Sequence, residues 1–170
     1  MSLCNSFPPI IDQAAKVIVL GSVPGIASLK QQQYYAHPRN TFWYILSRYF
    51  NVEIAASYEA RIELLSRHNV ALWDVLRSCE RRGSLDVNIE SGTIAINDFS
   101  ALYEEKNRIR AVLFNGAKAE AIYRRHVLPS LATKHQLLQL FRLPSTSPAM
   151  ASLTKEEKYQ VWSNVLSRFV

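Results

Sequence analysis

The sequence predicts an α/β fold, a three-layer α/β/α sandwich whose centre is a four-stranded parallel sheet. Short apolar runs alternate with amphipathic segments along the chain, as in proteins built from strand and helix units. Each run is short and ends near turn residues, which is typical of strands buried on both faces. No repeat or low-complexity linker interrupts the alternation, so we expect residues 1–170 to form one domain.

Four apolar runs supply the predicted strands. They are Lys16–Ser22, the start of Asn69–Leu76, Arg110–Phe114 and Gln136–Leu140. The first is rich in β-branched residues and ends at a turn, as expected of a buried strand. The third leads into Asn115-Gly116, a pair that favours a sharp turn.

Amphipathic segments supply the predicted helices, which are 41–50, Tyr58–Arg67, Thr93–Tyr103, 117–131 and Thr154–Arg168. Asn40 precedes the first of them and is a candidate N-cap, because a short polar side chain there can accept a hydrogen bond from the first helical turn. The last helix begins with the capping box Thr154-Lys155-Glu156-Glu157.

The composition favours a phosphate-bearing partner and excludes several kinds of site. The formal charge is +6, which favours a polyanion without proving one. Cys4 and Cys79 are the only cysteines, too few for a disulfide framework or a four-cysteine metal or iron–sulfur site. We expect metal-free chemistry without a cofactor. The N-terminus lacks a signal peptide and no apolar run is long enough to span a membrane, so we expect a soluble, cytoplasmic protein.

The ends of the predicted strands carry most of the candidate functional residues. Parallel sheets bind ligands outside the carboxyl ends of their strands, and these ends read GSVPG, LWDV, FNGAK and LPSTSPA. One shared cleft is therefore expected. GSVPG is neither a dinucleotide fingerprint nor a phosphate-binding loop, so we expect no nucleotide cofactor.

Five motifs in fixed order resemble a known family. GSVPG, YYAHPRNTFW, LWDVL with RRGSLD, FNGAKA and LPSTSPA look like the uracil-DNA glycosylase superfamily, and most like its hypoxanthine-DNA glycosylase (DNA-deoxyinosine glycosylase) branch. The chain is also similar to the mismatch-specific branch, chiefly in the first two motifs. The matches run from Val17 to about Met150, which makes chance improbable.

The resemblance implies a monofunctional DNA glycosylase of base excision repair. Such an enzyme flips a deaminated base out of double-stranded DNA and hydrolyses its bond to the sugar, leaving an abasic site. In the hypoxanthine branch the asparagine that corresponds to Asn40 is implied as the catalytic side chain. Its amide would orient water or donate a hydrogen bond to the departing base. The N-cap role is the structural alternative for the same side chain.

The resemblance also implies a base-binding pocket. Phe42 looks like the family's stacking residue, although it also fits the buried face of its helix. Asn115 could bind a base edge through its amide, although an asparagine before glycine is commonly a turn residue. The other residues assigned to this pocket are Gly21, Ser22, Val23 and Tyr35.

The loop Pro144-Ser145-Thr146-Ser147-Pro148 resembles the segment that holds DNA phosphates. Its hydroxyls and amides, restrained by two prolines, would bind phosphate with little entropy to lose. A plain surface loop is the alternative. Lys118 could also contact phosphate. We expect no Schiff-base chemistry from it, since that would require a desolvated lysine.

Two differences from the wider superfamily bear on which base the protein would remove. Other branches place Asp, Asn or Glu where this chain has Ser22 and Val23, and many place His where it has Leu143. The first change leaves no carboxylate there to compete with Asn40. The second removes a usual electrophile and puts strong uracil excision in doubt, so hypoxanthine is the better-matched substrate and uracil is possible. His37 is more simply a structural hydrogen-bonding residue. Asp74 and Asp86 are widely separated in the sequence and are not expected to act as a carboxylate pair.

Two other function classes remain open on the sequence. An α/β hydrolase with Ser22 or Ser145 as nucleophile would require a Gly-x-Ser-x-Gly elbow, which the chain lacks. A DNA-binding protein on the same scaffold, without catalysis or acting on another lesion, would explain the charge but not the clustered motifs. Release of a free base would separate this class from a glycosylase.

Overall fold

The computed structural model describes residues 2–54 and 56–170 and has a four-stranded parallel sheet at its centre. The strands lie in the order β3 (Val70–Asp74), β2 (Val17–Gly21), β6 (Ala111–Asn115) and β7 (Gln139–Leu143). Every neighbouring pair is parallel. The predicted sheet is thus confirmed. β7 begins three residues later than predicted, because residues Thr133–Gln136 form the short helix α6.

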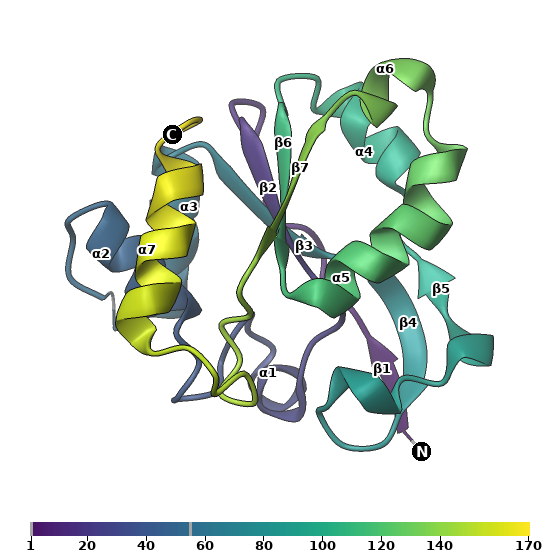
Figure 1. Ribbon diagram of the computed structural model, residues 1–170, viewed down its shortest axis with the longest axis horizontal. Helices are drawn as coiled ribbons and strands as arrows, with labels where there is room; N and C mark the ends of the chain where they lie inside the picture. The colour runs from purple at the N-terminus through teal and green to yellow at the C-terminus, as the bar shows by residue number, and fades with distance from the viewer. Residues whose placement is uncertain (1, 55) are drawn as a thin grey trace.

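Helices cover the sheet on both sides, as predicted (Figure 1). On one side lie α2 (Phe42–Tyr49), α3 (Tyr58–Arg67) and α7 (Lys155–Leu166). On the other lie α4 (Phe99–Glu105), α5 (Ala117–Ile122) and α6. α1 (Ile26–Gln31) lies at the lower end, beside the loop that leads into α7. The predicted capping box of Thr154 and Glu157 is present at the start of α7.

A second sheet was not predicted. β1 (Ser2–Asn5), β4 (Leu76–Arg81) and β5 (Ala95–Ile96) form a three-stranded antiparallel sheet in the order β1–β4–β5. β4 follows β3 after one residue, and β5 occupies part of the segment predicted as a helix. α4 therefore begins only at Phe99, with Asp98 as its N-cap. Cys4 and Cys79 face each other across β1 and β4 as unbridged thiols.

The end of the fourth predicted helix, 117–131, also differs. α5 stops at Ile122 and continues as a π-helical turn over Tyr123–Val127 and a 3-10 turn over Leu128–Ser130. Pro129 lies in the first positions of that last turn, where the missing N–H of proline is tolerated. The predicted helix is thus present but irregular over its second half.

The core fixes the sheet rigidly beneath its carboxyl edge. Val17 to Leu20 are fully buried, and Phe114, Tyr123 and Trp162 are among the largest buried side chains.

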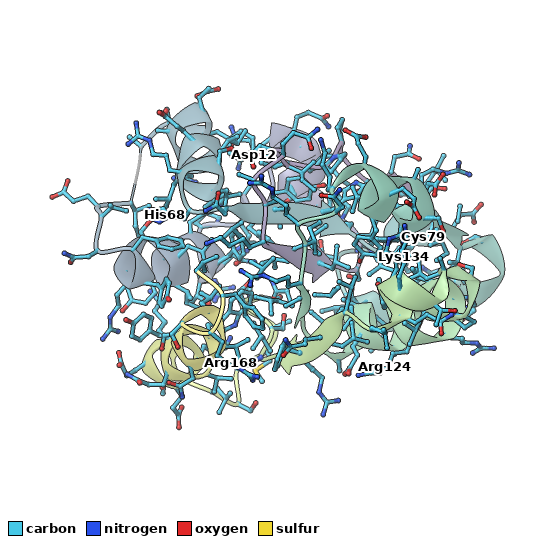
Figure 2. The ribbon with its side chains drawn as sticks, turned by 90° about the horizontal axis from the view of Figure 1, so that it is seen from above. Asp12, His68, Cys79, Arg124, Lys134 and Arg168 are labelled. Carbon is cyan, nitrogen blue, oxygen red and sulfur yellow. The ribbon has the colours of Figure 1, made fainter. Side chains whose placement is uncertain are left out.

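No described helix is long and apolar enough to cross a membrane. Part of the positive charge is neutralised away from this edge: Figure 2 shows Arg124 and Lys134, which pair with Glu120 and Glu104.

Candidate active site

A pocket of about 820 Å³ lies at the carboxyl ends of β2, β3 and β6. The turn after β2, the segment 84–87 and the loop after β7 complete its walls. Its size is within the range of pockets that enclose small organic ligands. The four strand-end motifs predicted to share one cleft therefore do so.

Asn40 lies at the pocket with its two amide atoms in different environments. Its Oδ1 accepts a hydrogen bond from the N–H of Phe42 at 2.9 Å. The N-cap of α2 is Thr41, not Asn40 as predicted, and the Thr41 side chain makes no capping hydrogen bond. Asn40, the residue before the N-cap, provides the side-chain acceptor instead. No described residue accepts from its Nδ2. The capping and ligand-binding roles are therefore compatible, since each uses a different atom.

Asn115 is tied to the loop after β7. Its Oδ1 accepts from the N–H of Thr146 and its Nδ2 donates to the Thr146 hydroxyl, both at 2.8 Å. Thr41 also donates its backbone N–H to the Thr146 carbonyl at 3.0 Å. The side chain expected to bind a base edge thus lines the pocket, but its first use is to fix this loop.

Gly116 allows that loop to approach β6. Its φ is +105°, and an added Cβ would lie 3.1 Å from the Cβ of Ser145. Glycine is required there, because other residues rarely adopt this conformation. The Asn-Gly turn is therefore real, and it serves to bring residues 145 and 146 against the strand.

Helix α7 holds the other end of the same loop. Trp162 donates its indole N–H to the Pro144 carbonyl at 2.9 Å. Lys158, only 4% exposed, donates to the carbonyls of Met150 and Ser147 at 2.7 and 3.4 Å. Burial lowers the pKa of this ammonium group. The backbone of residues 144–150 is thus held at several points, unlike a plain surface loop.

Two aromatic residues line the pocket, the buried Tyr34 and the more exposed Tyr35. Phe42 is fully buried and does not line the pocket, so the structure does not support its predicted direct contact with a base. Its position on the core face of α2 explains the difference. Tyr35 lies against it with ring centroids 4.2 Å apart and lines the pocket. Phe42 therefore supports the ring of Tyr35 from behind.

Asp74 and the Tyr35 hydroxyl meet at the pocket floor beside Gly21. An added Cβ at Gly21 would lie 2.4 Å from Asp74 Oδ1 and 3.2 Å from Tyr35 Oη, so only glycine fits. Asp74 is 3% exposed, and its Oδ2 accepts from the Ser6 hydroxyl at 3.1 Å. Tyr35 Oη is buried and has no hydrogen-bond partner among the described residues.

Both floor groups favour their protonated forms. Burial raises the pKa of Asp74 to about 7, with a smaller rise from Asp86, while Ser6 and Arg81 oppose it. Burial, with the Asp74 charge, also raises the pKa of Tyr35 well above its usual range. The floor can therefore hold a neutral carboxyl and a neutral hydroxyl near pH 7.

Arg81 clamps two of the motifs together. It is 1% exposed and donates to the carbonyls of Pro24 at 2.6 Å and Gly83 at 2.9 Å. Its guanidinium also lies 3.7 Å from Asp86, whose other oxygen accepts from Ser22 at 2.7 Å. The GSVPG turn and the RRGSLD segment are thus joined through buried polar contacts.

Asp74 and Asp86, which are widely separated in the sequence, both line the pocket. Burial raises the pKa of Asp86, and Ser22, Arg81 and Lys118 oppose the rise. Lys118 does not itself line the pocket, and Val23 is buried in its wall. Sequence reasoning missed Ser6, Asp74, Arg81 and Lys158; only Asp74, at a strand end, carried a usable signal.

Comparison with known proteins gives a consistent result. The family model described as the uracil DNA glycosylase superfamily matches residues 8–166. A curated protein of Methanosarcina barkeri named hypoxanthine DNA glycosylase is 39% identical over 68% of this chain and 72% of its own length. One of Methanosarcina acetivorans with the same name is 36% identical over the same shares.

A solved structure extends the likeness to nearly the whole chain. It is the solution NMR structure of a candidate uracil DNA glycosylase from Methanosarcina acetivorans. The two chains are 29% identical, with a TM-score of 0.78 over 98% of this chain and 99% of the other.

Proposed function

The chain belongs to the uracil-DNA glycosylase superfamily and is a DNA glycosylase, and we propose that it removes hypoxanthine from double-stranded DNA. Two relatives that bear the name of this activity support the substrate. The lack of a carboxylate or amide at Ser22 and Val23, and of histidine at Leu143, separates the pocket from branches specialised for uracil. Uracil is the second candidate substrate.

The observation that carries the proposed mechanism is that the two amide atoms of Asn40 have different partners. The oxygen is fixed by the N–H of Phe42, so the orientation of the side chain is set before a ligand enters. The amide Nδ2 then donates toward the pocket, either to water or to the departing base. A donor that is already oriented stabilises developing charge without reorganisation when the bond breaks.

The reaction is a hydrolysis. The water oxygen forms a bond to the sugar C1′ while the bond from C1′ to the purine N9 breaks. One proton of the water ends on the released base and the other remains on the new sugar hydroxyl. We propose that water, and not Lys118, is the nucleophile, because Lys118 lies outside the pocket lining. The product is an intact strand with an abasic site.

The base and the DNA backbone would be bound by different parts of the pocket. The ring of Tyr35, supported by Phe42, offers the stacking surface, worth about 1–3 kcal/mol per base. The loop 144–150 offers hydroxyls and amides to phosphates at a fixed position. The proposed chemistry needs no group from a second subunit, so we propose that the protein acts as a monomer. We place this activity in the cytoplasm, where the substrate DNA of such a protein would lie.

The test is release of free base from duplexes that contain one deoxyinosine or one deoxyuridine. The wild type should release hypoxanthine, and Asn40→Ala should slow release by about a hundredfold. Asn164→Ala, an exposed asparagine on α7 outside the pocket lining, is the matched control and should retain the wild-type rate. DNA binding without release of either base would instead indicate a non-catalytic protein or another lesion.

A further inference from the structure

We propose that Asp74 is a second catalytic residue, a neutral acid that donates a hydrogen bond to the O6 and N7 edge of the flipped purine. This inference rests on the proposed function and narrows its substrate class to 6-oxopurines. It assigns a role to a side chain that the sequence motifs do not explain. It also accounts for the Tyr35 hydroxyl at the pocket floor, which has no hydrogen-bond partner among the described residues.

The position of Asp74 limits what its carboxyl group can contact. It lies at the carboxyl end of β3, lines the pocket and is nearly inaccessible from elsewhere. Oδ2 accepts from Ser6, so a proton on the carboxyl group resides on Oδ1. Oδ1 borders Gly21, and no described residue donates to it. The proton therefore lies on the oxygen beside Gly21, and both residues line the pocket that a flipped base would enter.

The pocket floor holds a second buried polar group beside Asp74. Tyr35 Oη lies beside the same glycine and is buried without a partner among the described residues. Buried polar groups of native proteins are nearly always hydrogen-bonded, so an unpartnered one calls for a specific reason. A polar ligand next to Asp74 and Tyr35 would supply that reason. The ring of Tyr35 stacks on the base while its hydroxyl borders the floor.

The surrounding charges favour the neutral form of Asp74. The negative charge of Asp86 raises the pKa of Asp74, and the positive charge of Arg81 lowers it. The other titratable groups that face it are the hydroxyls of Tyr34, Tyr35 and Tyr58. With burial as the largest effect, the pKa of Asp74 is about 7. Near neutral pH the group is thus able to donate.

A donor at this position distinguishes purines. Hypoxanthine, like guanine, presents two acceptors, O6 and N7, on one edge, whereas adenine presents a donor at N6 beside N7. A donor directed at O6 therefore favours the deaminated base over adenine, whose N6 amino group would oppose it, while N7 accepts equally from both purines. As the glycosidic bond breaks, negative charge accumulates on the base. A hydrogen bond strengthens with that charge, whereas an ionised Asp74 would repel it.

The test is the pH dependence of hypoxanthine release in single-turnover reactions from pH 5.5 to 9.5. The wild-type rate should fall as Asp74 ionises above about pH 7, by up to tenfold per pH unit. Asp74→Asn carries a permanent N–H donor of the same shape, so its rate should stay level over this range. Asp74→Ala should be about a hundredfold slower than wild type below pH 7.

Two further variants exclude a structural explanation. Ser6→Ala removes a donor that stabilises the carboxylate, so the decline should move to higher pH. Asp12→Asn changes an aspartate outside the pocket lining, labelled at the upper edge of Figure 2, and should keep the wild-type profile. Melting curves establish that each variant is folded.

The outcomes separate this inference from the proposed function. The role of Asp74 alone would be overturned by either of two results. One is that the rate of hypoxanthine release falls with pH in Asp74→Asn as it does in wild type. The other is that Asp74→Ala releases hypoxanthine at the wild-type rate. If the wild type releases no hypoxanthine at any pH, the proposed function fails instead. Equal losses on deoxyinosine and deoxyuridine in Asp74→Ala would contradict the preference for 6-oxopurines.

Discussion

The two sides of the pocket differ in how far their polar atoms are already bonded. On one side, Asn115, Thr146 and the oxygen of Asn40 are joined by short hydrogen bonds to the chain itself. On the other, Tyr35 Oη has no hydrogen-bond partner within residues 2–54 and 56–170, and one oxygen of Asp74 accepts from Ser6. We call them the bonded side and the open side. The first holds the shape of the site, while the second keeps binding capacity for a ligand.

The largest expected effect is on the open side and concerns stability. A folded-state pKa raised to about 7 means that Asp74 binds its proton more tightly when folded than its usual value of 3.8 allows when unfolded. The stabilisation of the folded state that comes from this protonation is present in full below pH 4. It is lost as the pH rises to about 7. The difference amounts to at most about 4 kcal/mol.

Asp74→Asn should remove this dependence. The variant should match wild type in free energy of unfolding near pH 4 and exceed it increasingly up to pH 7, with a constant difference above. Urea denaturation at pH 4, 5.5, 7 and 8.5 measures it. A constant difference across this series would show that Asp74 ionises in the folded protein as it does in water.

The next prediction tests which atom of the Asn40 amide acts in catalysis. Asn40→Asp retains an oxygen for the N–H of Phe42 but loses the NH2 group. Base release should therefore fall by about a hundredfold while the melting temperature stays within a few degrees of wild type. Asn40→Ala should lose both activity and the capping bond. Wild-type activity in Asn40→Asp would assign the catalytic role to the oxygen.

The bonded side should respond to Asn115→Ala mainly through stability. The substitution leaves the buried N–H and hydroxyl of Thr146 without their side-chain partners, at a cost of about 1–3 kcal/mol. Affinity for an abasic-site duplex should fall with it, since the loop 144–150 loses its link to β6. Unfolding curves and binding titrations at one salt concentration measure the two effects. A lower rate with unchanged stability and affinity would favour direct base contact.

The smallest effect is expected for Tyr35→Phe. The ring that packs on Phe42 is kept, and the hydroxyl that is removed has no hydrogen-bond partner in the described part of the chain. The free energy of unfolding should therefore change by less than about 1 kcal/mol. Tyr35→Ala, which removes the ring as well, should weaken substrate binding far more. A marked loss of stability in Tyr35→Phe would show that the hydroxyl is bonded within the folded chain.

The contrast between the two sides also explains what the sequence could predict. The parallel sheet and its strand ends follow from local apolar patterns, and these ends brought Gly21, Asn115 and residues 144–148 into view. Helical spacing placed Phe42 on the buried face of its helix. It could not show that the ring of Tyr35, and not that of Phe42, lines the pocket. The contact between Ser6 and Asp74 spans 68 positions and depends on an edge strand that alternates too briefly to be recognised.

The contact of Ser6 with Asp74 has a consequence for how this protein can adapt. Ser6 lies outside residues 8–166, the part of the chain that matches the family model, yet its hydroxyl touches a carboxyl group at the centre of the pocket. A substitution at residue 6 would alter acidity at that centre while leaving every pocket-lining residue in place. The working pH of a lineage could therefore drift through a peripheral position, and its catalytic framework would be inherited unchanged.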